Sequence, residues 1–245
     1  MSWMFPRSSG IRAPEPREWI LGALYLPVFL FFLNFAILTY FPALGFPLTE
    51  PRNYFFANLL YMTVNFAVML LIFRRTLWQS LREFEGKMLL SVLIGFGMCY
   101  GANLVLTTAY TVLDIMPENY NQEAVNSLLG GYPLAMTLCT VVLAPLAEEC
   151  LFRGVLFAPL ARRCLPAAYA LSMFLFAGMH VFQFLGSMTA ANTILCLSLY
   201  LPASFSLCWV YQKTGNIWAS IFLHMFINFQ SVLASLLRSL MQAFL

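Results

Sequence analysis

Seven long runs of apolar residues dominate the chain. They cover roughly 19–41, 53–73, 88–113, 132–160, 166–185, 189–212 and 216–237. A helix rises about 1.5 Å per residue, so a run of about 20 residues crosses the ~30 Å hydrocarbon layer of a membrane. Only 9% of the 245 residues are charged, whereas soluble domains carry about 25%. The sequence therefore predicts an all-α, polytopic membrane helix bundle of seven transmembrane helices, with eight as the alternative count.

The composition leaves no room for a separate soluble domain, because 61% of the residues are hydrophobic. We expect a single integral membrane domain over 1–245. It comprises a polar tail at 1–18, accessory spans within 19–129 and catalytic core spans within 130–237. The tail lacks the short apolar core and small-residue cleavage site of a signal peptide, so the first span is expected to be retained.

Lys and Arg residues divide unevenly when successive loops are assigned to alternate sides of the membrane. Only Arg52 and Arg238 fall on one side, and Arg153 lies inside a run. The positive-inside rule then places the N-terminus in the cytoplasm. The net charge of +3 does not indicate nucleic-acid binding, because the basic residues cluster beside apolar runs. The expected partner of the protein is the lipid bilayer. The ten residues on the cytoplasmic side are Arg7, Arg12, Arg17, Arg74, Arg75, Arg82, Lys87, Arg162, Arg163 and Lys213.

Polar side chains interrupt three of the apolar runs. An ionisable group at the bilayer centre costs about 2.5–3.5 kcal/mol on insertion scales, so such groups usually face the bundle interior and mark function. Counting residues from the cytoplasmic ends of the runs places Glu148, His180, His224 and Asn228 at similar depths, about 12–21 Å below that face. One buried polar site built by three helices is therefore expected. The residues are Glu148, Glu149 and Arg153 in the fourth run, His180 in the fifth, and His224 and Asn228 in the seventh.

The two adjacent glutamates are expected to differ in role. Glu149 and Arg153 are four residues apart, with the acid first, which is the favoured order for a helical ion pair. Glu148 is rotated about 100° away and has no counter-charge on its own helix. We interpret Glu149 and Arg153 as a structural pair, and Glu148 as a candidate general base.

Two residues near the glutamates affect the shape and the packing of this helix. Pro145 cannot donate a backbone hydrogen bond, so it should kink the span or open its backbone. Gly154 permits a neighbouring helix to approach closely. The six cysteines form no CxxC pair, and five lie in apolar runs, so they are expected to be packing residues with free thiols.

Three motifs together resemble a known family. "EECLFR" fits E-E-x-x-x-R, "FAGMH" fits F-x-x-x-H, and "HMFIN" fits H-x-x-x-N. Their order and spacing resemble the CPBP family, the CAAX proteases and bacteriocin-processing membrane peptidases, which include type II CAAX prenyl endopeptidases. The resemblance covers about residues 130–232. It implies an intramembrane endopeptidase, which acts on a membrane-associated peptide or protein, lipidated or not. The compact chain, with little soluble extension, favours a bacterial cell membrane as its location.

The resemblance also implies a role for each motif residue. Glu148 and His180 would activate the water, and His224 and Asn228 would form the oxyanion site. Glu149 and Arg153 would support the structure. No cofactor is expected in this reading. The alternative is a zinc ion, for which Glu148, His180 and His224 are the candidate ligands.

Two other classes of protein are open on the sequence. A membrane immunity or scaffold protein of the same family could keep the buried site without using it. A small transporter could use the buried charges to carry ions, although neither paired interrupted helices nor internal repeats are visible.

Overall fold

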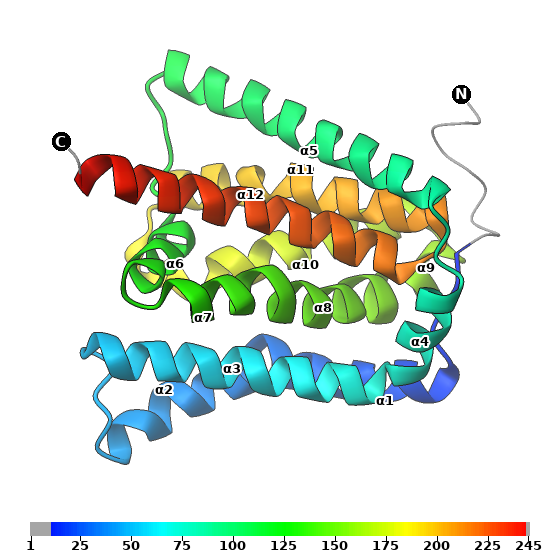
Figure 1. Ribbon diagram of the computed structural model, residues 1–245, viewed down its shortest axis with the longest axis horizontal. Helices are drawn as coiled ribbons and strands as arrows, with labels where there is room; N and C mark the ends of the chain where they lie inside the picture. Colours follow the sequence, from blue (N-terminus) through cyan, green and yellow to red (C-terminus); the bar gives the residue numbers. More distant parts are fainter. Residues whose placement is uncertain (1–10, 244–245) are drawn as a thin grey trace.

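A computed structural model describes residues 11–243, and within that range the regular structure is entirely helical (Figure 1). Among the described residues, seven helical segments are long and apolar enough to cross a membrane, which confirms the predicted number and the all-α bundle. Arg7, one of the ten basic residues assigned to the cytoplasmic side, lies outside the described residues. The segments are Pro16–Ala43, Pro51–Ile72, Lys87–Val112, Pro133–Ala161, Leu165–Ser187, Ala190–Thr214 and Ile217–Gln242.

Three of the seven segments are composite. The first consists of α1 (Pro16–Pro27), π-helical η2 (Val28–Phe32) and α2 (Leu33–Ala43). The fourth consists of α7 (Pro133–Leu138), π-helical η3 (Cys139–Leu143), α8 (Ala144–Glu149), π-helical η4 (Cys150–Phe157) and α9 (Ala158–Ala161). The fifth joins α10 (Leu165–Val181) to the 3₁₀ turn η5 (Phe182–Ser187). The others are α3 (Pro51–Ile72), α5 (Lys87–Val112), α11 (Ala190–Thr214) and α12 (Ile217–Ala243).

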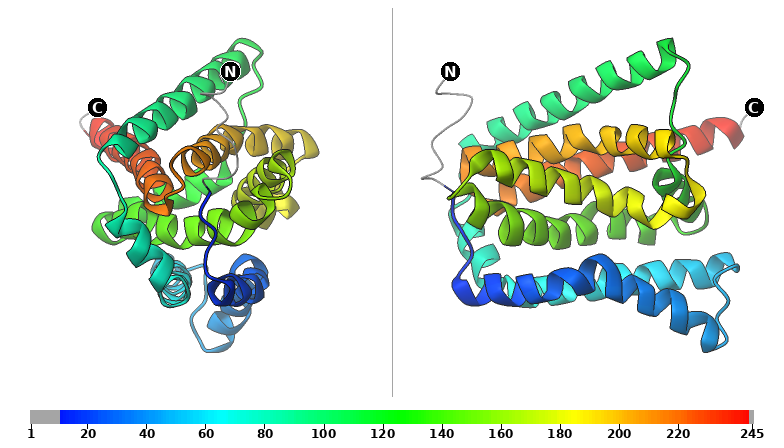
Figure 2. Two further views of the ribbon diagram at one scale, coloured as in Figure 1. Left: turned by 90° about the vertical axis from the view of Figure 1, so that its right-hand side faces the viewer. Right: turned by 180° about the vertical axis from the view of Figure 1, so that it is seen from behind.

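The fourth segment forms the centre of the bundle. It packs against α1, α3, α10 and α12, and α11 joins α10 to α5 and α12. Half of its most apolar window is buried inside the protein, against 17–22% in the first three segments. The pair α1–α3 covers one side of this core and α5 lies on the opposite side (Figures 1 and 2). The charged residues of the fourth segment are therefore held away from lipid.

Proline and the π-helical stretches leave backbone carbonyls of the fourth segment without their usual donors. The Ala144 N–H bonds the carbonyl of Cys139 and not that of Thr140. The next residue, Pro145, has no N–H to offer. Farther along, Pro159 occupies the position whose N–H would bond the Val155 carbonyl in an α-helix. The expectation of an opened backbone near Pro145 is thus met.

Side chains from other helices satisfy these carbonyls. Asn228 Nδ2 donates to Thr140 O at 2.8 Å, and Trp19 Nε1 donates to Val155 O at 3.0 Å. The irregular helix is therefore fastened to α12 and α1 by hydrogen bonds that a regular helix would not accept. Gly154 adds a close approach, because a Cβ there would lie 2.9 Å from the Phe73 ring.

The short connecting helices lie at opposite ends of the bundle. α4 (Arg74–Arg82) follows α3, and α6 (Tyr120–Gly131) lies in the third loop. Arg12 forms an ion pair with Glu83, and Asn216 Nδ2 donates to Ser80 O at 2.6 Å. The described part of the tail, the second loop and the sixth loop thus share one end, while α6 and the last turn of α12 lie at the other (Figure 1).

Candidate active site

Glu149 and Arg153 form a fully buried ion pair, as their spacing predicts. Arg153 Nη1 lies 3.1 Å from Glu149 Oε1, and both side chains are 0% exposed. Arg153 Nη2 donates to Ser204 O of α11 at 3.2 Å, and the guanidinium lies 4.9 Å from the centroid of the Phe176 ring. The pair thus joins the fourth segment to α10 and α11, which suits a structural role.

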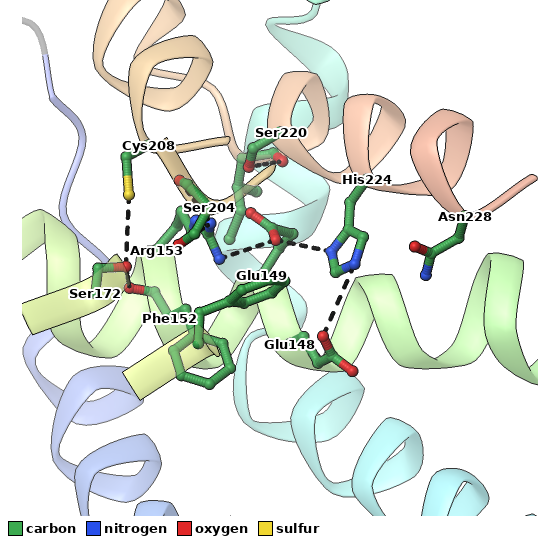
Figure 3. A network of polar contacts seen from close by, with 12 residues as sticks. Glu148, Glu149, Phe152, Arg153, Ser172, Ser204, Cys208, Ser220, His224 and Asn228 are labelled. Atoms are coloured by element: carbon green, nitrogen blue, oxygen red, sulfur yellow. Dashed lines mark hydrogen bonds and ion pairs between the residues drawn. The ribbon is translucent and has the colours of Figure 1, made fainter. Parts of the chain in front are cut away.

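His224 connects the Glu149–Arg153 pair to the other glutamate, Glu148 (Figure 3). Its Nδ1 lies 2.9 Å from Glu149 Oε1. Because a carboxylate accepts, Nδ1 carries a hydrogen and donates it. The other ring nitrogen, Nε2, lies 3.8 Å from Glu148 Oε2. His224 therefore lies between the two glutamates and presents a different nitrogen to each.

Glu148 lacks a direct hydrogen-bond donor. Its Oε2 is buried without a hydrogen-bond partner among the described residues. The 3.8 Å to His224 is too long for a direct hydrogen bond. Among the described residues Glu148 forms no ion pair within its own helix, as the sequence predicts, and its one ion-pair contact is with His224 of α12. An unpaired carboxylate oxygen at the edge of a buried polar cluster is suited to binding a small polar molecule.

His180 lies close to this cluster, separated from it by one aromatic ring. The Phe176 ring centroid is 4.9 Å from that of His180 and 5.5 Å from that of His224. His180 Nδ1 lies 2.9 Å from the Phe176 carbonyl, which can only accept. Nδ1 therefore carries the hydrogen, and Nε2 is left as an acceptor.

Asn228 lies one helical turn after His224 on α12. Its side chain lies beside His224 in Figure 3. Its Nδ2 donates to Thr140 O at 2.8 Å, which fixes the orientation of the amide. An amide nitrogen carries two hydrogens, so one remains for another acceptor. Contacts thus join Glu148, Glu149, Arg153 and His224 directly, with His180 and Asn228 beside them.

Three residues that sequence reasoning did not single out also build this region. Thr140 accepts from Asn228, Ser204 accepts from Arg153, and Tyr200 stacks on His180 with ring centroids 4.6 Å apart. Thr140 could have been suspected from its position five residues before Pro145. Tyr200 and Ser204 carry no such signal, because their roles depend on how α11 packs against α10.

The described residues do not form a ready metal site. No group of three His, Cys, Asp or Glu side chains among them converges as ligands. His224 Nδ1 is occupied by Glu149, and His180 Nδ1 by the Phe176 carbonyl. Both contacts leave Nε2 free, and a ligand histidine commonly donates its other N–H to a carboxylate or carbonyl, so Glu148 and the two Nε2 atoms are the groups that would hold a zinc ion.

The comparisons with known proteins point to one family. A family model described as "Type II CAAX prenyl endopeptidase Rce1-like" matches residues 130–230, which contain all six candidate site residues. A protein of Bacillus subtilis (strain 168), named "Putative membrane peptidase YdiL", is 28% identical over 166 residues. Both matches support the CAAX protease (CPBP) family that the three motifs resemble. No solved structure matches it.

The extent of these matches agrees with the architecture of the bundle. The alignment with YdiL covers 66% of this chain and 64% of that relative, so the chain spans a little under two thirds of its length. The CAAX protease model begins at residue 130, just before the fourth segment, and ends on α12. The matched part is therefore the part that contains the buried polar cluster.

Proposed function

We propose that the protein is an intramembrane endopeptidase of the glutamate type. It would hydrolyse a peptide bond of a membrane-associated protein or peptide. The observation that carries this proposal is the buried, unpaired Glu148 Oε2, which lies 3.8 Å from His224 Nε2. The gap is too wide for a direct hydrogen bond, so both groups keep hydrogen-bonding capacity for a water molecule beside them.

The proposed reaction uses Glu148 as the base. A water attacks the carbonyl carbon of the scissile bond while Glu148 takes its proton. The tetrahedral oxyanion then collapses, the C–N bond breaks, and the proton passes from Glu148 to the departing amine. His180 would accept a hydrogen bond from the same water through Nε2, which is the free acceptor once Nδ1 donates to the Phe176 carbonyl. Two acceptors would thus orient the water.

His224 and Asn228 would stabilise the oxyanion. An oxyanion site needs donors that are fixed before the reaction begins. Glu149 fixes the His224 ring, and Thr140 fixes the Asn228 amide. The formal charges of Glu148, Glu149, Arg153 and His224 cancel when His224 carries hydrogens on both nitrogens. In that state Nε2 is a donor, and the buried cluster carries no net charge.

We propose that no metal takes part. The support for the metal-free reaction is that no group of three His, Cys, Asp or Glu side chains converges among the described residues. The zinc alternative would require Nε2 of His180 and Nε2 of His224 to converge with Glu148 on one ion. It predicts a stoichiometric metal ion that the metal-free reaction does not need.

We further propose that the chain resides in a bacterial cell membrane with its N-terminus in the cytoplasm. The support is the basic end of the bundle, where the tail, the second loop and the sixth loop meet. Residues 130–237 would be the catalytic core and 19–129 accessory spans. Peptides with or without a lipid anchor are both candidate substrates.

A non-catalytic scaffold or immunity role is the competing proposal, because a buried ion cluster can also serve only to hold helices together. The test is peptide cleavage by the purified protein in lipid nanodiscs. A farnesylated peptide, its unlipidated copy and solubilised membrane proteins are each incubated with and without a strong chelator. We expect cleavage that survives the chelator and is lost in Glu148→Gln. No cleavage in any arm would favour the scaffold.

A further inference from the structure

Tyr200 of α11 covers one face of the His180 imidazole. The ring centroids are 4.6 Å apart, and the planes are inclined by 24°, which is a stacked arrangement. The Phe176 ring lies on His180 as well, tilted by 45° at 4.9 Å. With Nδ1 held by the Phe176 carbonyl at 2.9 Å, the imidazole is restrained by a hydrogen bond and by two rings. Its Nε2 is the one polar atom left for the site.

The Tyr200 ring is itself held at its far end. Its hydroxyl donates to Asn119 Oδ1 at 3.0 Å and accepts from Asn121 Nδ2 at 3.2 Å. Both asparagines belong to the segment at the beginning of α6, and Asn119 Oδ1 also accepts the Gln122 N–H at 3.1 Å. A phenol with both a donor and an acceptor partner cannot rotate or slide without losing one of them.

The loop that holds the Tyr200 hydroxyl is also bonded to α11 by a second, reciprocal pair of hydrogen bonds. The Glu118 N–H donates to Asn192 Oδ1 at 2.9 Å, and Asn192 Nδ2 donates to Glu118 O at 3.1 Å. Asn192 and Tyr200 are two turns apart on α11. The loop and α11 therefore form one unit, and the Tyr200 ring is the part of it that reaches the site.

We infer that Tyr200 is a positioning residue for His180, and that the loop from Glu118 to Asn121 sets its place. This inference rests on the proposed function, in which His180 Nε2 orients the attacking water. Stacking keeps the imidazole plane fixed, so that Nε2 points toward the water. The two asparagines keep the Tyr200 ring over the imidazole. Tyr200 would not touch the substrate. A small misplacement of a reacting group can lower a rate by about 100-fold.

The chain contains only two histidines, His180 and His224, which makes a direct test practical. Protein labelled with ¹⁵N-histidine and held in detergent micelles gives ring-nitrogen signals from two imidazoles, assigned with His180→Gln. We expect wild-type His180 to be a single tautomer with hydrogen on Nδ1. Tyr200→Leu should shift or broaden the His180 signals and leave those of His224 in place, whereas Tyr200→Phe, which keeps the stack, should shift them less.

The control is Tyr110 of α5. Its hydroxyl lies 2.5 Å from Oγ of Ser198, a residue of α11 like Tyr200. Tyr110→Leu and Tyr110→Phe should leave the His180 signals unchanged. In the cleavage assay, Tyr200→Leu should lower kcat about 10- to 100-fold with KM nearly constant, and Tyr200→Phe should lower it only a few-fold.

Unchanged His180 signals in folded Tyr200→Leu would overturn the inference, as would equal shifts in the Tyr110 variants. If the wild type cleaves nothing, the proposed function fails, yet the spectra still decide whether Tyr200 holds His180. If the wild type cleaves and Tyr200→Leu retains full kcat, the positioning role is wrong and the peptidase assignment stands.

Discussion

The side-chain amide of Asn228 donates to the backbone carbonyl of Thr140, with Nδ2 and O 2.8 Å apart. This carbonyl is available because the Ala144 N–H bonds Cys139 and because Pro145 has no N–H. Asn228 therefore replaces a missing backbone donor at the same time as it lies beside His224. Its structural and chemical roles can be separated by experiment.

Asn228→Ala should lower the thermal unfolding temperature, because it leaves the Thr140 carbonyl without a donor, at a cost of about 1–3 kcal/mol if that carbonyl stays dry. The loss should be smaller in a Pro145→Ala background, where residue 145 regains an N–H. Asn58→Ala is the matched control, since Asn58 Nδ2 donates to Tyr54 O within the regular helix α3. Equal losses from Asn228→Ala in both backgrounds would contradict this account of Thr140.

Glu149→Gln should destabilise the protein. It leaves Arg153, which is 0% exposed, without its counter-charge. Removing one partner of a buried pair costs about 3–5 kcal/mol. Yield and unfolding temperature in detergent measure the effect, and Glu149→Gln combined with Arg153→Met should recover part of the loss. A Glu149→Gln protein with wild-type stability that lacks only activity would show that the roles of the two glutamates are misassigned.

His224→Ala and Asn228→Ala should both retain weak cleavage activity. Removing one oxyanion donor lowers the rate by about 10²–10³-fold and leaves the base in place. Elemental analysis of the purified proteins should find substoichiometric metal in the wild type and in both variants. One zinc ion per chain that disappears in His224→Ala and persists in Asn228→Ala would establish the zinc alternative.

Membrane orientation can be tested with a native thiol. Cys164 is exposed, whereas the other five cysteines are buried. It lies next to Arg162 and Arg163, at the end predicted to be cytoplasmic. A membrane-impermeant maleimide should label Cys164 only after cells are permeabilised. In a Cys164→Ser background, cysteine at position 118 should be labelled in intact cells. The reverse pattern at the two positions would invert the topology.

The sequence contained enough to predict the seven spans and the Glu149–Arg153 pair. Span length and hydropathy depend on neighbouring residues alone, and an i, i+4 pair depends on one helix. The meeting of three motifs could also be anticipated, because polar groups at one depth in a bilayer tend to share one site. These inferences need no knowledge of which helices are neighbours.

The remaining contacts depend on packing that the sequence does not reveal. Glu18 accepts the backbone N–H groups of Arg75 and Thr76 at 3.0 and 3.2 Å, so a residue 57 positions away satisfies the first turn of α4. Tyr200 reaches His180 only because α11 lies against α10. The helix α6 was not anticipated in the third loop, although Asn119 caps it by accepting the Gln122 N–H.

The most direct test of the central claim is the cleavage rate of Glu148→Gln. Glutamine keeps the size of the side chain and removes the base, and Glu148 has no ion partner as close as that of Glu149. We predict an unfolding temperature close to that of the wild type and no detectable cleavage of a peptide that the wild type cuts. A folded Glu148→Gln protein that cleaves that peptide at the wild-type rate would contradict Glu148 as the base that activates water.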